Sequence, residues 1–350
     1  MESQRPDLSQ VSLEIREYIE KLENEITRLR GASLPSRVRS TSREETTIEA
    51  ESAPPEPPTT IQVITLTASG LAKRTPRHLY LRQRRGGMGI FDLDAPEDDP
   101  PAILILADLS QYLLLFTSLA RAFRLPVSQI DEMPVRGRGT SIVTRMNLQP
   151  DERLVAAMPD EARGAVALVS AHGMVRHLRH HIFGEYMKPG TVLFDAGKYG
   201  MLTAGCRTPG DGDLLIATRQ GKAIRFPEKL VPPQGGAGIR LEKGDVVTAV
   251  AAANDDSRVL LVDAIGRGTL RLMSGFAANK SAGGGGKTAM NTDCLVAALS
   301  AEDPEDVFMI SRWSKVIRFS LMEIPAKEGV VQGVNCMALR ADEVVAVTVS

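Results

Sequence analysis

The sequence predicts an all-β protein in which a six-bladed β-propeller follows a short N-terminal helix and a disordered linker. Three observations support this prediction: an internal repeat, the short strands within each copy, and the spacing of the copies. After Thr60 an apolar run, a polar turn that usually contains glycine, and a second strand with a basic residue near its end recur six times. Successive copies begin about 45 to 53 residues apart, which is a typical length for one propeller blade.

Each copy is expected to contain four short strands. The first two form a hairpin, and a glycine-containing stretch and an acidic turn accompany two more, as in residues 238–247 and 139–155. Radial repetition of such units leaves few free sheet edges. The first strands of the six copies begin at Val63, Leu113, Val166, Leu214, Val259 and Val307.

Residues 1–31 are predicted to form the N-terminal helix, because Leu8, Ile15, Leu22 and Leu29 recur at one heptad position. Two interpretations stay open. The helix either forms a parallel coiled coil that makes a homodimer, or it docks on its own domain or frays, since isolated helices of this length are marginally stable in water. Residues 32–60 are rich in Ser, Thr, Glu and Pro and poor in apolar residues, which predicts a disordered linker.

The composition favours a cytoplasmic protein without a membrane span. No apolar stretch reaches the roughly 18 residues that a span requires, and the N-terminus has no apolar signal-peptide core. The three cysteines lie far apart and form no C-x-x-C motif, which indicates reduced thiols rather than a disulfide framework or a zinc site. The formal net charge is −1, but residues 61–350 hold 34 Lys and Arg against 31 Asp and Glu. Binding to nucleic acid therefore depends on whether the cations gather on one surface.

Two patterns that could indicate a cofactor or a metal have simpler explanations. The run from Gly283 to Thr288 resembles the end of a phosphate-binding loop, but its first glycine is missing and no strand–loop–helix unit surrounds it. His177 and His181 would lie on one face of a strand and His180 on the other. We therefore expect no cofactor and no metal ion.

A basic, glycine-rich motif follows the first copy, with the sequence Gln83-Arg84-Arg85-Gly86-Gly87-Met88-Gly89. It resembles the box motif of the DNA gyrase A C-terminal domain, which has a basic residue where this chain has Met88. The stretches LTASGLAKRTP, YLLLFTSLARAFRLPV and RGRGTSIV are also similar to blades of that family, so the resemblance covers residues 61–350. It implies a β-pinwheel whose basic perimeter wraps double-stranded DNA, with the box needed for chiral wrapping. Because Met88 removes one cation, the chirality and tightness of wrapping stay open.

The resemblance also bears on catalysis and partners. The gyrase A protein carries a winged-helix domain with a nucleophilic tyrosine, whereas about 60 residues precede the blades here and no tyrosine follows an arginine. We therefore expect no strand cleavage by this chain alone, a nucleoid-associated place in the cytoplasm, and topoisomerase subunits as partners. The alternative is a propeller that binds proteins and whose DNA surface has decayed, which the near-neutral charge and Met88 allow.

The predicted DNA contacts are the box and the basic residues near the ends of the second strands. Guanidinium groups bind phosphate oxygens bidentately, and consecutive glycines let a backbone approach the duplex and offer its N–H groups. Because a repeat position faces the same way in every blade, we expect these cations to form a ring at one rim. Affinity should then depend on salt and hardly on DNA sequence. Arg136 and Arg138 are further candidates, and the main set is Lys73, Arg74, Gln83, Arg84, Arg85, Gly86, Gly87, Gly89, Arg124, Arg176, Arg225, Arg271 and Arg318.

Overall fold

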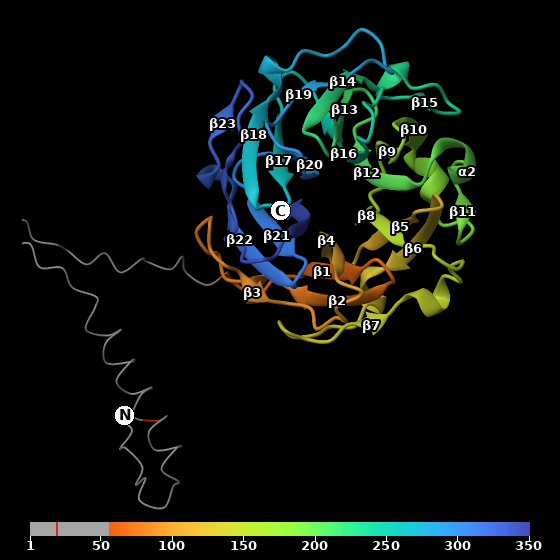
Figure 1. The fold of residues 1–350 in the computed structure, drawn as a ribbon. Coiled ribbons are helices and arrows are strands. Elements are labelled where there is room, and N and C mark those ends of the chain that lie inside the picture. Colours follow the sequence, from red (N-terminus) through yellow and green to blue (C-terminus); the bar gives the residue numbers. More distant parts are fainter. Residues whose placement is uncertain (1–18, 20–55) are drawn as a thin grey trace, which may run out of the picture. The chain divides into compact units, whose positions relative to one another are not determined.

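A computed structural model describes residues 56–350 and Ile19. The predicted helix, the linker up to residue 55, and the coiled coil with its homodimer lie outside the described residues, apart from Ile19. The described chain forms six sheets around a common axis, as Figure 1 shows, and the all-β, six-bladed propeller is confirmed.

Three antiparallel strands from one stretch of chain form the main part of each blade. The two hairpin strands come first, and the third strand returns to the innermost position, next to the axis. In blades 1 to 3 these strands are β1 (Ile61–Thr67), β2 (Leu71–Pro76) and β4 (Pro101–Asp108); β5 (Tyr112–Thr117), β6 (Arg121–Pro126) and β8 (Leu154–Pro159); and β9 (Ala165–Ser170), β10 (Met174–Arg179) and β12 (Leu202–Thr208). In blades 4 to 6 they are β13 (Asp213–Thr218), β14 (Lys222–Pro227) and β16 (Val247–Ala253); β17 (Arg258–Asp263), β18 (Arg267–Leu272) and β20 (Leu295–Ala301); and β21 (Asp306–Ser311), β22 (Lys315–Ser320) and β25 (Val344–Val349).

The outer edge of each blade is a short strand lent by the next stretch of chain. It pairs with the second hairpin strand of the preceding blade, and the outer strand of blade 6 comes from the first stretch, so the ring closes between blades 6 and 1. The outer strands of blades 1 to 6 are β7 (Thr140–Ser141), β11 (Thr191–Val192), β15 (Gly236–Ala237), β19 (Lys287–Thr288), β23 (Ala326–Lys327) with β24 (Val334–Asn335), and β3 (Ile90–Phe91).

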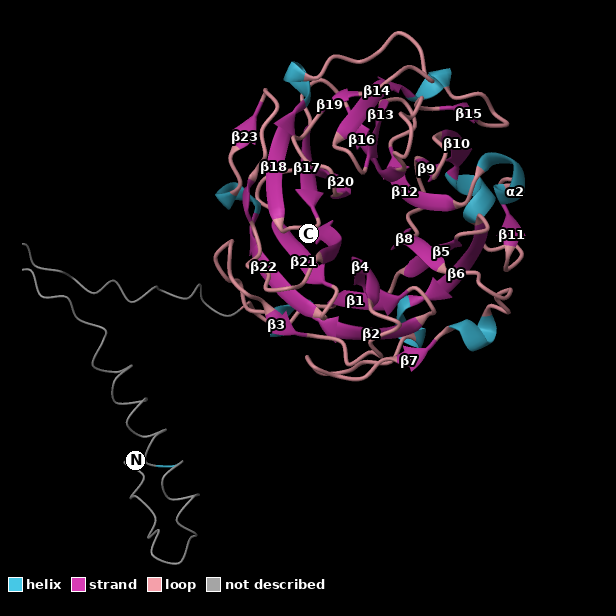
Figure 2. Ribbon diagram, in the orientation of Figure 1, coloured by secondary structure: helices cyan, strands magenta, loops and turns pink. Residues whose placement is uncertain are grey.

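Short helices follow the second hairpin strands. Figure 2 shows them as small cyan segments toward the outside of the sheets. They are the 3-10 helices η1 (Arg77–Leu79), η2 (Val127–Gln129), η4 (His180–Phe183), η5 (Glu228–Leu230), η6 (Met273–Gly275) and η7 (Leu321–Glu323), and two further short helices are η3 (Val143–Arg145) and α2 (Ala196–Tyr199).

Local chemistry explains the hairpin turns that the repeat revealed. In every blade but the fourth, the side chain that ends the first strand accepts a hydrogen bond from the backbone N–H four residues later, as Thr67 does from Leu71 (3.0 Å) and Thr117 does from Arg121 (3.2 Å). Gly70 has a φ of 94°, which is a conformation that glycine adopts without steric cost. The polar turn with glycine is thus a requirement of the hairpin.

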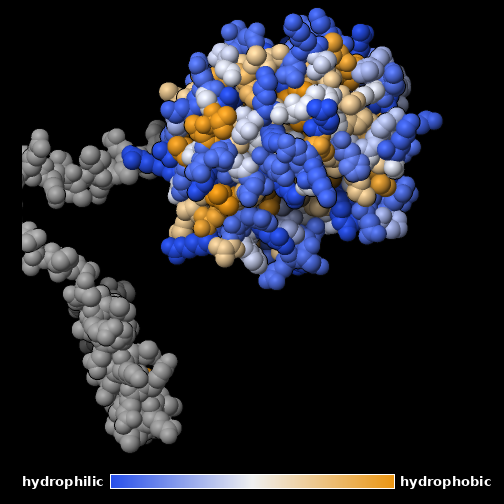
Figure 3. All heavy atoms as spheres, turned by 45° about the horizontal axis from the view of Figure 1, so that its top comes forward, coloured by the Kyte–Doolittle hydropathy of each residue, from blue (hydrophilic) through white to orange (hydrophobic). Residues whose placement is uncertain are grey.

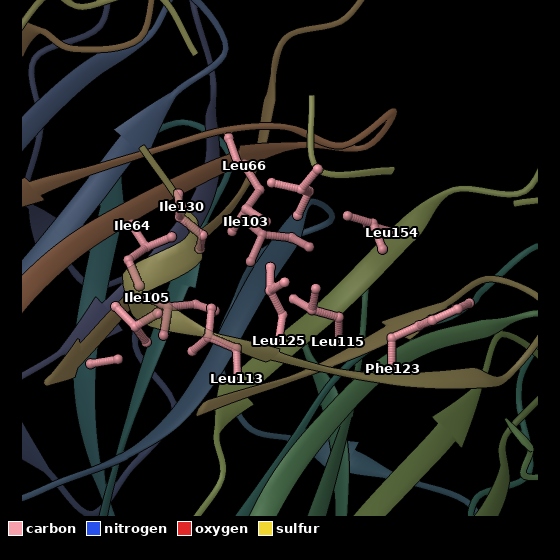
Figure 4. Close-up of a cluster of buried hydrophobic side chains, with 14 of the residues drawn as sticks. Ile64, Leu66, Ile103, Ile105, Leu113, Leu115, Phe123, Leu125, Ile130 and Leu154 are labelled. Atoms are coloured by element: carbon pink, nitrogen blue, oxygen red, sulfur yellow. The ribbon is translucent and has the colours of Figure 1, made fainter. Parts of the chain in front are cut away.

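The hydrophobic core is divided into six clusters, one between each pair of neighbouring blades. The cluster between blades 1 and 2 joins Ile64 and Ile105 to Leu113 and Leu125, and Figure 4 shows these side chains facing one another from two blades. The smallest of the clusters lies between blades 6 and 1, where Val63 and Tyr80 meet residues of β21 and β22. The junction that closes the ring therefore has the least apolar packing among the described blades.

Candidate nucleic-acid interface

The fourth residue of each second hairpin strand lies at the junction with the following blade. In blades 1 to 6 this residue is Arg74, Arg124, His177, Arg225, Leu270 and Arg318. Most of these positions carry a hydrogen-bonding side chain, and the neighbouring blade supplies acceptors. We call the place that these residues occupy in each blade the junction position.

Arg318 joins blade 6 to blade 1 and is only 7% exposed. Its Nε donates to Asp306 Oδ2 at 2.7 Å, and its Nη1 donates to the carbonyl oxygen of Tyr80 at 3.0 Å. Nη1 also lies 2.6 Å from Glu56 Oε2. Charge and hydrogen bonding from Arg318 and Arg77 outweigh the effect of burial and hold the pKa of Glu56 below its usual value. A buried guanidinium thus bridges the junction that closes the ring.

Arg225 and Arg74 make the same connection elsewhere. Arg225 donates from Nη1 to the carbonyl oxygens of Met273 and Phe276, at 3.0 and 3.2 Å, in the next blade. Arg74 donates from Nε to the carbonyl oxygen of Ile130 at 2.8 Å. All these carbonyls belong to the short helix of the following blade or to the residue just after it, and that of Met273 also accepts the N–H of Phe276 at 3.0 Å. The junction arginines therefore cap the neighbouring helix.

In blades 2, 3 and 5 the junction position does not bond to a carbonyl of the neighbouring short helix. Arg124 Nε donates to Asp160 Oδ2 at 2.6 Å, and the other oxygen of Asp160 lies 2.6 Å from His180 Nε2. His177 Nε2 lies 2.7 Å from Glu228 Oε2. Leu270 instead joins the apolar cluster between blades 5 and 6.

The prediction of a solvent-facing ring is wrong for Lys73, Arg225, Arg271 and Arg318, which are buried. Arg74 and Arg124 keep part of their surface, but carboxylates already pair with both. The physical reason is the position of the second strand, whose end meets the next blade and its acceptors instead of solvent. These cations stabilise the propeller and are mostly unavailable to DNA.

Arg176 and Arg271 are also out of step with the other arginines. Arg176 is the third residue of β10 and Arg271 the fifth of β18, so each lies on the opposite face of its strand from the junction position. Arg271 is buried beside the ring of Phe276 and donates weakly to the carbonyl oxygen of Gly275 at 3.4 Å. Burial lowers its pKa. The sequence alone did not reveal that Arg176 and Arg271 are each shifted by one residue from the junction position.

Lys73 belongs to a buried polar network under the box. Its Nζ lies 2.6 Å from Asp92 Oδ1 and donates to the carbonyl oxygen of Asp92 at 2.9 Å. Thr65 and Tyr80 donate their hydroxyl groups to the same carboxylate. Burial lowers the pKa of Lys73, against the opposing charge of Asp92, and raises that of Tyr80. The network holds the chain that follows β3 against blade 1.

The box itself lies on the surface, directly before the outer strand of blade 6. Arg84 and Arg85 are exposed, and Gln83 is half-buried. Arg85 Nη1 donates to the carbonyl oxygen of Asn335 at 3.1 Å. Arg84 makes no side-chain hydrogen bond or ion pair with the described residues. Both guanidinium groups can therefore reach a ligand.

The box glycines face the protein. A Cβ on Gly89, whose φ is 70°, would lie 2.7 Å from the carbonyl oxygen of Val316. The N–H of Gly86 already donates to the carbonyl of Cys336 at 2.7 Å, and the N–H of Gly87 to that of Arg84 at 3.3 Å. The expectation that these N–H groups are offered to DNA is therefore wrong for Gly86 and Gly87. The glycines allow the box to lie flat on blade 6.

A set of exposed cations lies instead on the outer strands and on the loops that lead into or out of them. Asp94 donates its N–H to the carbonyl of Gly137 at 3.1 Å, so the segment after the box lies beside the loop that carries Arg136 and Arg138. None of these cations forms an ion pair with a carboxylate of the described chain, and every blade edge has at least one. The same loops also hold exposed carboxylates, which are Asp131, Glu132, Glu185, Glu242 and Glu328. We call this set of cations the perimeter cations: Arg84, Arg85, Arg136, Arg138, Lys188, Arg240, Lys280, Lys287 and Lys327.

Lys188, Arg240, Lys280, Lys287 and Lys327 were missed by the sequence reasoning. Their outer strands are only two residues long, too short to give an alternating pattern. The available signal was a basic residue within a few positions of glycine in the second half of most repeats.

Two of the clustered histidines form ion pairs or hydrogen bonds within the fold, and the glycine run lies in a loop. His177 and His180 pair with carboxylates at blade junctions, and Gly283 to Gly286 lie in the loop before β19. Across residues 56–350, no three His, Cys, Asp or Glu side chains are grouped to hold a metal ion. No helix of the described chain is long and apolar enough to cross a membrane.

Comparison with known proteins gives a consistent result. The family model of the DNA gyrase C-terminal domain, a β-propeller, matches residues 62–99, 111–159 and 212–254. The DNA gyrase A protein of Staphylococcus aureus (strain MRSA252) is 27% identical over 297 residues, which cover 81% of this chain and 34% of that protein. The chain thus spans about a third of the length of the curated relatives it matches.

Two solved structures show the same fold. The DNA gyrase A C-terminal domain superposes with a TM-score of 0.72 at 20% identity, covering 83% of this chain and 99% of that one. The C-terminal domain of DNA topoisomerase IV gives a TM-score of 0.57 at 18% identity, covering 83% and 93%. The resemblance seen in the box and the blades is confirmed.

Proposed function

We propose, for a chain that belongs to the DNA gyrase C-terminal domain family, that its perimeter binds and bends double-stranded DNA without reading the base sequence. The observation that carries this proposal is the set of perimeter cations. They are exposed, they lack carboxylate partners in the described chain, and they occur at the edge of every blade. A polyanion that follows the rim would meet one or more of them at each blade.

Exposed carboxylates lie on the loops that connect inner strands to the next blade, at Asp211, Asp256 and Glu302. These loops begin at the innermost strands, away from the outer strands, so like charge disfavours phosphates there. Exposed carboxylates lie beside the outer strands too, as at Asp94, Asp131 and Glu242, so the proposal rests on the unpaired cations of the rim.

The expected chemistry is phosphate binding. Each phosphate that a Lys or Arg neutralises releases counterions, and log K falls with log salt by about 0.9 per phosphate. Bending 20–30 base pairs by 40–90° costs about 1–6 kcal/mol, so several contacts must act together. The exposed loops of neighbouring blades can supply them. This function involves no strand cleavage by the chain itself.

Binding can be tested with two fluorescent duplexes of unrelated sequence at rising salt. We expect equal affinities for the two duplexes and a steep loss with salt. The double variant Arg84→Ala with Arg85→Ala should bind more weakly. Arg153→Ala with Arg219→Ala is the matched control, since both residues are exposed and neither is a perimeter cation. Affinity that ignores salt, or an equal loss in the control, would contradict the proposal.

We further propose that the bending serves DNA topology, with topoisomerase subunits as partners. The relative described above is a gyrase A protein, and this chain would act in trans, near the nucleoid. Ligation of nicked plasmid with increasing protein should change the linking number. Arg84→Ala with Arg85→Ala should reduce this change more than it reduces plain binding, and an equal loss of both would count against a special role of the box.

A further inference from the structure

Met88 is an exposed apolar side chain in the same segment as two exposed arginines, Arg84 and Arg85. It is 55% exposed, and Phe91 on β3 is 39% exposed three residues later. Gly87 and Gly89, on either side, face blade 6 closely, so Met88 is directed outward. Figure 3 shows hydrophobic side chains among hydrophilic ones on one face of the propeller.

The backbone that carries Met88 is held firmly. Gln83 donates its N–H to the carbonyl of Arg318 at 2.7 Å, and the N–H of Arg85 donates to Glu323 Oε2 at 3.0 Å. Ala338 donates to the carbonyl of Gly87 at 2.9 Å. Together with the bond from Gly86 to Cys336, these contacts tie the box to blade 6 and to the segment near β24. Because the backbone is fixed by these hydrogen bonds, the Met88 side chain can contact a ligand without the segment moving away.

Charge identifies the ligand that would cover Met88. Arg84 and Arg85 lie four and three residues before it, and both are exposed. A duplex whose phosphates bind these guanidinium groups presents a groove, not a phosphate, between its strands. An apolar side chain beside phosphate-binding arginines is the arrangement by which proteins wedge base steps apart from the minor groove, and methionine is among the residues used.

We propose that Met88 inserts as an apolar wedge at a base step in the minor groove and kinks the duplex at the box. This inference rests on the proposed DNA binding and specifies where the bend is made. The box motif that this segment resembles has a cation at the same position, so the substitution exchanges a phosphate contact for a kink. Wedges of this kind bend DNA by about 20–90° each.

A duplex with a central mismatch tests the wedge, because its bases are already partly unstacked. Wild-type protein should bind it about tenfold more tightly than the intact duplex, since the few kcal/mol of unstacking need not be supplied again. Met88→Ala should reduce this preference to less than about twofold. Met88→Lys should also lose the preference, while its salt slope steepens by about 0.9.

Met201→Ala is the matched control, since Met201 is 56% exposed and lies just before β12, away from the box. It should keep the wild-type preference. Equal wild-type affinity for the two duplexes, with normal salt dependence, would overturn the wedge and leave DNA binding intact. A preference that survives Met88→Ala would also overturn it. Failure of the wild-type protein to bind either duplex would overturn the proposed function, and the wedge with it.

Discussion

Replacing Arg318 by leucine tests the role of the junction position. Blade 5 already has a leucine at the junction position, since Leu270 lies there within an apolar cluster. There the first residue of the hairpin is Arg258, whereas in blade 6 it is the buried Asp306. Leucine is thus tolerated where no buried carboxylate faces it, and we expect it to be costly at position 318.

The expected loss of stability in Arg318→Leu depends on the groups that lose the guanidinium as a partner. Removing one member of a buried ion pair costs about 3–5 kcal/mol. Asp306 keeps Arg82 at 2.8 Å and Glu56 keeps Arg77 at 2.6 Å, which lowers the cost. The carbonyl of Tyr80 loses its donor, which adds about 1 kcal/mol. We therefore expect a loss of about 3–5 kcal/mol in the free energy of unfolding.

Urea denaturation measures this loss directly. The double variant Arg318→Leu with Asp306→Asn removes the buried charge as well, and we expect it to recover part of the stability. Arg225→Leu should cost less, because its partners Asp213 and Asp255 are 15% and 85% exposed and are more easily hydrated than Asp306, which is 3% exposed. A change below about 1 kcal/mol in Arg318→Leu, or no recovery in the double variant, would refute the assignment of a structural role.

Three further predictions concern single sites. Gly89→Ala should destabilise the protein by about 1–3 kcal/mol in urea, because the left-handed backbone and the nearby carbonyl of Val316 leave no room for Cβ; an unchanged midpoint would show that the box lies elsewhere. Burial raises the pKa of Asp263, so its charged form costs stability above that pKa and the cost fades as pH falls. Asp263→Ser, which keeps the hairpin cap, should therefore gain about 0.5–2 kcal/mol at neutral pH and less in mild acid, and a gain that grows toward acid would contradict this. Burial raises the pKa of Cys336 to about 12, so this thiol should react with a thiol reagent only after denaturation. Fast labelling of the native protein would contradict the burial of Cys336.

The fold could be predicted because the repeat encodes it at several levels. Each hairpin combines an apolar run with a turn residue that the backbone requires, as at Gly70, and the period repeats six times. The outer strands could not be assigned to their blades, because two-residue strands such as β7 give no periodic signal and their partner lies in the previous repeat.

The expected exposure is found for Arg84 and Arg85 in the box and not for the arginines along the strands, while DNA binding by the box stays a prediction. Arg225 and Arg318 look equally basic in the sequence, but their partners become apparent only when the blades are assembled; these partners are Asp213, Asp255, Asp306 and Glu56. A charge that recurs once per repeat indicates a common environment and does not show whether that environment is solvent or the next blade.

The salt dependence of DNA binding tests the central claim most directly, because it counts phosphate contacts. Changing Arg84, Arg85, Arg136 and Arg138 together to alanine removes four perimeter cations and leaves the junction arginines in place. The slope of log K against log salt should become shallower by about 3–4. An unchanged slope in a folded variant would contradict a DNA-binding perimeter.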